Sequence, residues 1–223
     1  MSESPQPAPK PERWWYQYHL WHLLVLVTVA AIPCSWYACK IRWFSPPMIL
    51  PPRIDPFAAG AAAMKQYDTN GDGTISGDEL EKAPSLKKSL ARIDRNEDAA
   101  VTAAETTGRI RQWQDSKLGR CSLLCEVNKG GKPLVGATVK FVPEKFLGDQ
   151  MQTATGVTDE DGLADVSVPI SSDEPSGLAP GLYLVEITKK GEDIPAKYNT
   201  KTILGEEIAI DVDELGILRF DLD

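Results

Sequence analysis

Residues 68–79 place an oxygen-bearing group at nearly every second position around a glycine turn, which strongly constrains what this stretch can form. They read Asp-Thr-Asn-Gly-Asp-Gly-Thr-Ile-Ser-Gly-Asp-Glu. A hard cation such as Ca²⁺ takes about six to eight oxygen ligands, and a twelve-residue loop can supply most of them from positions 1, 3, 5, 7, 9 and 12. The residues at these positions, our predicted ligands, are Asp68, Asn70, Asp72, Thr74, Ser76 and Glu79.

Each position suits its expected role. Gly73, at position 6, fits the sharp turn with positive φ that such a loop requires. Thr74 would contribute its main-chain carbonyl, Ser76 would act directly or through water, and Glu79 would bind with both carboxylate oxygens. The alternative is a solvated acidic turn in which Asp and Gly serve the backbone conformation alone.

The same register returns 26 residues later, in residues 94–105. Its corresponding ligands would be Asp94, Asn96, Asp98, Ala100, Thr102 and Glu105, with Ala100 acting through its carbonyl. Position 6 is Ala99, so a left-handed turn there costs about 1 kcal/mol or more. We therefore expect the second loop to bind weakly or to act as the structural partner of the first. A degenerate loop that never fills is the plainer alternative.

With helices around them, the two loops resemble an EF-hand pair, which would occupy residues 56–115. Asp55 and Pro56 predict the start of the first helix. We expect a connecting helix over residues 80–93, bent or restarted at Pro84, and a last helix over about 103–113. Position 8 of each loop, Ile75 and Val101, would form a short β contact. The resemblance is to compact pairs of bacterial surface and secreted proteins, and it implies Ca²⁺ as the cofactor.

An uncharged apolar stretch, residues 20–39, is long enough to cross a bilayer as a helix, and tryptophan and tyrosine residues flank both its ends. We predict a short tail over residues 1–17, a transmembrane helix over 18–39 and a proline-rich linker over 40–55. Basic residues lie on both sides, and their count slightly favours the orientation opposite to that of an exported domain. Because calcium is abundant outside the cell, we expect a cytoplasmic N-terminus and extracytoplasmic domains. A cleaved signal is the alternative.

The residues from Arg13 to Gln17, Leu23 to Thr28, Ile32-Pro33 and Ser35-Trp36 resemble anchor segments common in planctomycete membrane proteins. This likeness names no activity. It supports a place in the cell envelope.

Residues 119–223 alternate apolar and polar side chains between closely spaced turns, a pattern typical of an antiparallel β-sandwich of about seven strands. The expected strands are 121–128, 137–142, 152–158, 163–168, 181–189, 196–202, 206–212 and 218–222. Cys121 and Cys125 stand about 13 Å apart on an extended strand, so we expect free buried thiols, with a disulfide only if the stretch is irregular.

Four segments carry a resemblance to the carboxypeptidase regulatory-like domain: Gly131 to Val139, Thr158 to Gly162, Pro180 to Tyr183 and Ile194 to Asn199. This family has a transthyretin-like, seven-stranded sandwich. It carries no catalytic residues to transfer, so the resemblance implies a folding, adhesion or binding module. The whole chain is then an α + β multidomain protein, with one transmembrane helix, a helical EF-hand pair and a β-sandwich.

Both histidines, His19 and His22, lie at the predicted membrane segment, so residues 40–223 offer none for catalysis or zinc binding. A net charge of −8 without a basic patch argues against nucleic acid as a partner. We therefore expect a membrane-anchored, non-enzymatic calcium-binding protein. The alternatives are an adhesion or structural module that binds protein or polysaccharide, with calcium only a folding ligand, and a calcium sensor facing the cytoplasm.

Overall fold

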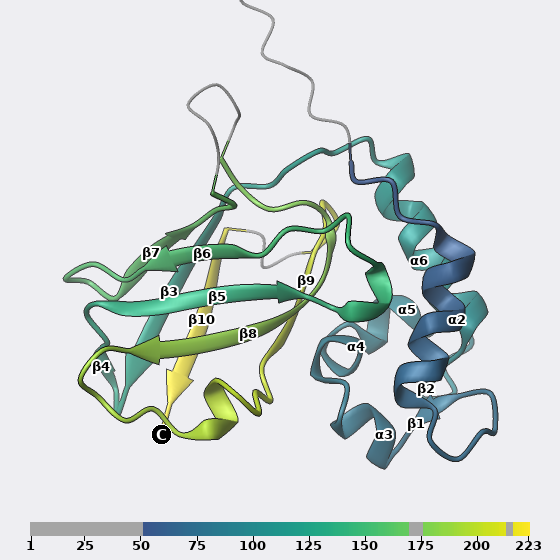
Figure 1. The fold of residues 1–223 in the computed structure, drawn as a ribbon, viewed down its shortest axis with the longest axis horizontal. Helices are drawn as coiled ribbons and strands as arrows, with labels where there is room; N and C mark the ends of the chain where they lie inside the picture. The colour runs from purple at the N-terminus through teal and green to yellow at the C-terminus, as the bar shows by residue number, and fades with distance from the viewer. Residues whose placement is uncertain (1–50, 170–175, 213–215) are drawn as a thin grey trace, which may run out of the picture. The chain divides into compact units, whose positions relative to one another are not determined.

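The structure is a computed structural model, and it describes residues 51–169, 176–212 and 216–223 (Figure 1). These residues belong to one compact unit that runs from Ile49 to Asp223. The predicted transmembrane helix over 18–39, the tail before it and most of the linker lie outside the described residues. Within the described part of the chain, no helix is both long enough and apolar enough to span a bilayer.

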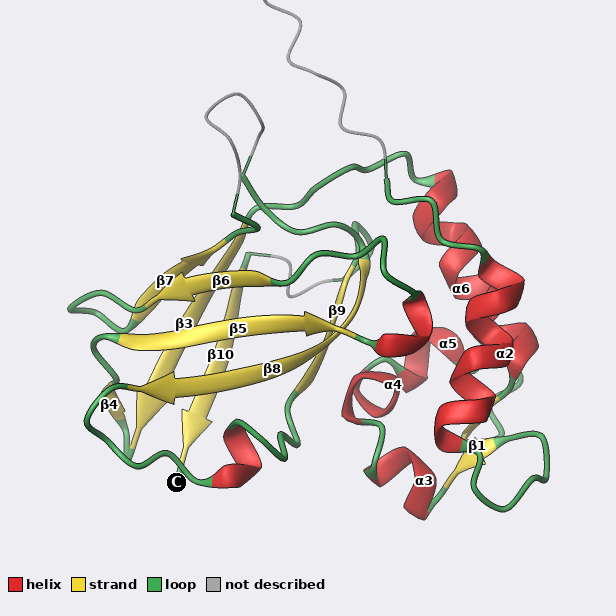
Figure 2. Ribbon diagram, in the orientation of Figure 1, coloured by secondary structure: helices red, strands yellow, loops and turns green. Residues whose placement is uncertain are grey.

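The described fold combines helices with mainly antiparallel sheets, and the helices precede the sandwich strands (Figure 2). The helical region contains α2 (Pro56–Tyr67), α3 (Asp78–Glu81), α4 (Pro84–Lys88), α5 (Leu90–Ile93) and α6 (Ala103–Asp115). Asp55 caps α2, because its carboxylate accepts hydrogen bonds from the Phe57 and Ala58 amides at 3.0 and 3.1 Å. Thr102 caps α6 in a capping box closed by Glu105.

The connecting helix expected over residues 80–93 is three short helices, α3, α4 and α5. Pro84 occupies the first turn of α4, where its missing N–H costs nothing. Ser89 then ends α4 and begins α5, and its hydroxyl donates to the Ser85 carbonyl at 2.7 Å. Such a hydroxyl bond to the preceding turn favours a bend. The restart at Pro84 was predicted from the sequence, and the second break at Ser89 was not.

Helices α2 and α6 cross closely at Gly60. A Cβ there would come within 2.6 Å of the Ala103 carbonyl oxygen, so a larger residue cannot be accommodated at this crossing without movement of α6. The chain that enters α2 is also held to α6, because the Ile54 carbonyl accepts a hydrogen bond from Gln114 Nε2 at 2.6 Å. The two outer helices of this region therefore form one packed layer.

Two sheets form the sandwich. One contains β3 (Leu123–Lys129), β4 (Lys132–Pro133), β7 (Leu163–Val166) and β10 (Ile217–Leu222), with β3 bonded to the other three. The second has the order β6 (Ala154–Val157), β5 (Ala137–Pro143), β8 (Gly181–Lys189), β9 (Gly205–Ile208). Phe141 of β5 meets Phe220 of β10 edge-on across the core, with ring centroids 6.4 Å apart.

Three details differ from the sequence prediction. Residues 196–198 form a 3₁₀ turn, η2 (Ala196–Tyr198), where a strand over 196–202 was expected. The strand expected over 206–212 is β9, which ends at Ile208. β10 pairs with β3 in parallel, whereas an entirely antiparallel sandwich was expected. Alternation of side chains sets which face is buried, but it carries no information about the direction of the neighbouring strand.

Cys121 and Cys125 are both buried free thiols, as predicted. Burial raises the pKa of the Cys121 thiol to about 11, and burial together with nearby Glu206 raises that of Cys125 further. Both side chains therefore stay protonated and behave as small apolar core residues.

Candidate calcium site

The first loop runs from the end of α2 to the start of α3 and keeps its side-chain oxygens directed at its own main chain. Asp68 accepts from the Gly71 amide at 2.6 Å and from the Gly73 amide at 3.0 Å. Asn70 Oδ1 accepts from the Asp72 amide at 2.8 Å, and Asp72 accepts from the Thr74 amide at 2.8 Å. Positions 1, 3 and 5 of the predicted ligand set thus lie along one continuous run of backbone donors.

Gly71 and Gly73 make this path possible, since their φ values are 74° and 86°. Glycine adopts this left-handed region at little cost. Both α-carbons face open space, with no atom within 4 Å of a Cβ built at either position. The requirement for glycine here is therefore conformational and not steric.

Glu79, the predicted closing ligand, is 6% exposed. Its Oε1 accepts from the Thr69 amide at 2.7 Å, from the Thr69 hydroxyl at 2.9 Å and from the Asn70 amide at 3.1 Å. Its Oε2 is buried and has no hydrogen-bond partner, a property that no other side-chain oxygen or nitrogen of the described residues shares. The Ser76 amide faces the carboxylate but does not complete a hydrogen bond to Oε2.

Two of the loop carboxylates, Glu79 and Asp72, are stabilised in their charged form. The Thr69 hydroxyl and amide keep the pKa of Glu79 below its usual value, and the Thr74 hydroxyl and amide do the same for Asp72. A buried, ionised oxygen without a donor is unfavourable by itself. A cation bound at Oε2 would remove that penalty, so the oxygen-only ligand set of this loop fits Ca²⁺.

Taken by themselves, the His, Cys, Asp and Glu side chains of the described residues form no group of three arranged to hold a metal ion. The loop's predicted ligands also include an amide, a hydroxyl and a main-chain carbonyl. Asn70 would supply the amide, Ser76 the hydroxyl and Thr74 the main-chain carbonyl. Asp68 and Asp72 are bonded to amides as described above.

The second loop, residues 94–105, repeats the backbone path of the first. Asp94 accepts from the Glu97 and Ala99 amides at 2.7 and 2.8 Å, and Asn96 Oδ1 accepts from the Asp98 amide at 3.2 Å. Asp98 accepts from the Ala100 amide at 2.9 Å. In both loops, therefore, the residues at positions 1, 3 and 5 accept hydrogen bonds from the corresponding loop amides.

Two features separate the second loop from the first. Glu97 and Ala99 have φ values of 60° and 61°, where the first loop has glycines. Glu105 uses both carboxylate oxygens in hydrogen bonds, Oε1 from the Arg95 amide at 3.1 Å and Oε2 from Thr102 at 2.8 and 2.9 Å. The second loop therefore has two strained positions and a closing glutamate that is already satisfied by donors.

The loops are joined by β1 (Ile75–Ser76) and β2 (Ala100–Val101), which pair antiparallel with Ile75 opposite Val101. Both side chains are fully buried. The predicted contact between the two position-8 residues is confirmed.

An EF-hand family profile matches residues 61–83. The matched residues contain the end of α2, the whole first loop and α3. A search of curated proteins gives no match.

The EF-hand match supports calcium as the ion for the first loop. Two features of this EF hand were not predicted. Thr69, at position 2, holds Glu79 through both its amide and its hydroxyl. The exit helix α3 is capped by Gly77, with φ 49° and no side-chain cap, one residue later than the equivalent cap Thr102 of α6. The Gly-Asp sequence at loop positions 10 and 11 could have indicated this later start of α3.

Two buried carboxylates attach the EF-hand helices to the sandwich, and sequence reasoning identified neither. Glu144, at the end of β5, accepts hydrogen bonds from Tyr67 at 2.9 Å, from Gln66 at 3.3 Å and from Ser85. Burial raises the pKa of this carboxyl, and the hydrogen bonds oppose the increase only in part. We call these residues the Glu144 cluster.

Glu207 of β9 is the second attachment. It accepts from Arg109 Nε, from Arg92 Nε at 2.7 Å and from Trp113 Nε1 at 2.9 Å, and Asp211 binds the other side of Arg109 at 2.7 and 2.8 Å. We call these residues the Glu207 cluster. From the sequence, a glutamate in a strand of alternating residues is expected to face solvent. Its partners on distant helices were therefore not predictable from the sequence.

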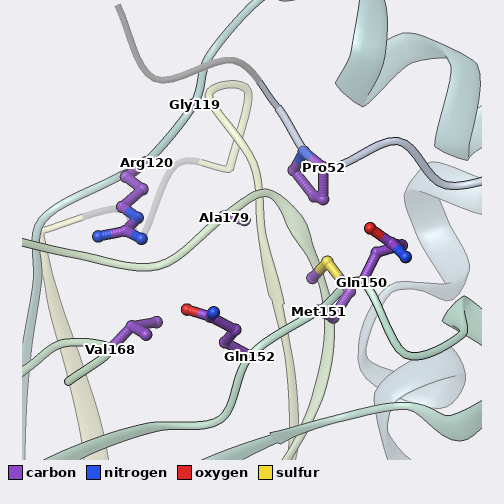
Figure 3. A pocket seen from close by; sticks show the side chains of 8 residues that line it. All are labelled: Pro52, Gly119, Arg120, Gln150, Met151, Gln152, Val168 and Ala179. Carbon is purple, nitrogen blue, oxygen red and sulfur yellow. The ribbon is translucent and has the colours of Figure 1, made fainter. Parts of the chain in front are cut away.

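A cavity of about 190 Å³ lies where the chain enters the sandwich (Figure 3). Its lining includes Pro52, Arg120, Met151 and the amides of Gln150 and Gln152, and it contains no acidic side chain or histidine. This lining offers no pair of groups for acid and base catalysis.

Proposed function

We propose that this chain is a non-enzymatic calcium-binding protein whose first loop holds the ion. One observation carries the proposal: Glu79 closes an EF-hand-matched loop with one buried oxygen that accepts no hydrogen bond. Asp68, Asn70, Asp72, Thr74 and Ser76 complete the ligand set. When bound, the ion would neutralise carboxylates that otherwise repel one another. The chain's own residues align the ligands through the loop amides and cover Glu79.

The attachment of this loop to the sandwich gives calcium a structural effect. Tyr67 directly precedes the first ligand and donates to Glu144, and Ser85 of α4 donates to the same carboxylate. Ion binding restrains the loop between α2 and α3, and so restrains the helices that meet at Glu144. The proposed role of calcium is to stabilise the attachment of the EF-hand helices to the sandwich.

For the rest of the chain, we propose the arrangement that the sequence predicts. Residues 18–39 anchor the protein in a membrane, and the EF-hand pair and the sandwich lie on the extracytoplasmic side as a structural or binding module. The resemblances to planctomycete anchor segments and to the carboxypeptidase regulatory-like domain support this. So does the sandwich of two mainly antiparallel sheets.

Calorimetric titration of calcium into the full-length chain in detergent micelles tests the ion site. We expect saturable binding that falls about a hundredfold or more in Glu79→Gln, because one charge and one ligand oxygen are lost. Glu105→Gln is the matched control, and it should change the main binding event little. Failure of the wild type to bind up to millimolar calcium would overturn the proposal.

The alternative with the opposite membrane orientation, a cytoplasmic calcium sensor, is tested separately. Ser176 is exposed, so a Ser176→Cys variant can be probed with an impermeant thiol reagent in intact cells. Labelling above the level of the parent chain supports an extracytoplasmic sandwich. Labelling only after lysis supports the sensor.

A further inference from the structure

Backbone hydrogen bonds join the two sheets along one side of the sandwich. Along the other side the sheets separate. On the joined side, Thr155 of β6 and Ser167, directly after β7, exchange two backbone hydrogen bonds of 2.9 and 3.2 Å. On the other side lie β9 and β10, each at the edge of its sheet. Edge strands expose unpaired backbone groups and are usually covered or protected.

Helix α4 covers β9. Gly205, the first residue of β9, lies so near the start of α4 that a Cβ on it would come within 2.1 Å of the Ser85 nitrogen. The Glu207 cluster adds α5 and α6 to the same strand. The edge of the second sheet is thus closed by the EF-hand helices.

Among the residues that the structure describes, no helix covers the outer edge of β10 in this way. The Gly216 and Leu222 carbonyls accept from the Leu124 and Gly130 amides, so the even-numbered residues of this strand direct their backbone groups at β3. The backbone N–H and C=O groups of Ile217, Arg219 and Asp221 therefore point outward. Among the described residues these groups have no hydrogen-bond partner. At the strand's end, the Asp223 amide donates to Tyr198 of η2 at 3.2 Å.

A cavity of about 620 Å³ lies beside this edge. Arg219, Phe220 and Asp221 line one wall, and the other contains residues 203–206 together with Pro84, Lys87 and Lys88 of α4. A residue in a strand occupies roughly 160 Å³, from the rise per residue and the spacings between strands and sheets. The cavity therefore has room for about four residues in extended conformation, close to the length of the open edge.

The walls also indicate what kind of chain fits. Ile203 is 59% exposed at the cavity and offers an apolar contact. The basic side chains are balanced by acids: Lys87 pairs with Glu81 at 2.6 Å, and Arg219 pairs with Glu126 at 2.9 Å. The cavity therefore selects for backbone shape and one apolar side chain, and charge contributes little.

We propose that an extended segment of another polypeptide binds here as an added strand on β10, with an apolar side chain against Ile203. Such strand addition takes its affinity from main-chain hydrogen bonds and its specificity from alternate side chains. A second copy of the sandwich is disfavoured as the occupant. The wall formed by α4 and residues 203–206 leaves room for about one added strand and not for the whole edge of a second sheet.

Fluorescent eight-residue peptides that alternate threonine with valine, isoleucine or leucine can test this against the full-length chain in detergent micelles. We expect saturable binding, shifts of the Ile217, Arg219 and Asp221 amide resonances, and little dependence on salt. Arg219→Pro removes an outward N–H that β3 does not use, and should weaken binding about tenfold. Arg219→Thr keeps that N–H and should bind like the wild type.

Far-UV circular dichroism and thermal unfolding establish that both variants are folded before binding is compared. Equal binding by Arg219→Pro, or no peptide binding up to millimolar concentration, overturns the proposal. A concentration-dependent dimer that Arg219→Pro abolishes also overturns it, because the occupant would then be a second copy.

Discussion

The first and second loops share a backbone path but differ in how their closing glutamates are used. Glu79 leaves Oε2 without a donor, whereas Glu105 places both oxygens in hydrogen bonds and completes the cap of α6. The first loop turns at glycines, and the second turns at Glu97 and Ala99. One loop thus has an unsatisfied ligand and a relaxed backbone, and the other has a satisfied ligand and a strained backbone.

The attachments of the two halves to the sandwich differ in a related way. The first half meets Glu144 through neutral donors, and the second meets Glu207 through two arginines and a tryptophan. The carboxylate without a cation has a raised pKa, whereas the carboxylate of Asp211, paired with Arg109, has a lowered one. The half whose loop matches the EF-hand profile is thus attached to the sandwich through neutral hydrogen-bond donors, whereas the other half is attached through ion pairs.

The largest expected difference in stability is between the Glu-to-Gln variants of the two clusters. Glu207→Gln leaves buried Arg109 without its main counter-charge and should lower the free energy of unfolding by about 3–5 kcal/mol. Glu144→Gln keeps the shape and faces hydroxyl groups that can donate or accept, so it should cost about 1 kcal/mol or less. Urea unfolding of each full-length variant measures both values. Equal costs would show that the two attachments do not differ.

The pH dependence should have opposite signs in the two halves. Above pH about 4.3 the unfolded chain releases the Glu144 proton more readily than the folded chain, so this carboxyl destabilises the fold as pH rises through its folded pKa. Glu144→Gln should therefore gain stability relative to the wild type as the pH rises from about 4.3 through the folded pKa of Glu144.

Asp211 has a lowered pKa, held down mainly by its hydrogen bonds from Arg109. Its contribution to stability is present above pH about 3.9 and is lost as pH falls through its folded pKa. Asp211→Asn should therefore lose stability relative to the wild type above this range and approach it in acid. Thermal unfolding measured across this pH range compares each variant, Glu144→Gln and Asp211→Asn, with the wild type. If the stabilities of both variants changed with pH in parallel to that of the wild type, the predicted opposite pH dependence would be wrong.

Exchanging the position-6 residues should narrow the difference between the loops. Ala99→Gly relieves a left-handed alanine and should stabilise the second loop by about 1 kcal/mol. Gly73→Ala should destabilise the first by a similar amount, and no neighbouring atom adds a clash. Calcium calorimetry beside thermal unfolding separates binding from folding. If neither exchange has an effect, backbone strain does not distinguish the loops.

The smallest effects concern the helix caps. Thr102→Ala removes the cap of α6 and should cost about 1 kcal/mol. Ser76→Ala removes no cap, since α3 begins after Gly77, and should change stability without calcium by less than about 0.5 kcal/mol. Chemical denaturation in a calcium chelator measures both. If Ser76→Ala lowered the free energy of unfolding as much as Thr102→Ala does, then both exit helices would be capped by the residue at loop position 9.

The sequence predicted those features that depend on residues near one another in the chain. These include the cap at Asp55, the restart at Pro84, the contact between Ile75 and Val101, and the left-handed Ala99. It did not predict the 3₁₀ turn at residues 196–198, where Pro195 and a run of polar residues still allow an alternating pattern. Glu144 and Glu207 were missed because their donors lie 59 to 115 residues away in the chain.

The hydrogen bond from Gln114 to the Ile54 carbonyl offers a mechanical load a short path through the molecule. A pull applied at Pro51 reaches Ile54 before the first turn of α2. Gln114 lies at the end of α6, where the chain continues toward β3. Tension can therefore pass directly from the incoming chain to the segment that enters the sandwich. The two loops lie outside this shortest path, because both lie between Ile54 and Gln114 in the chain.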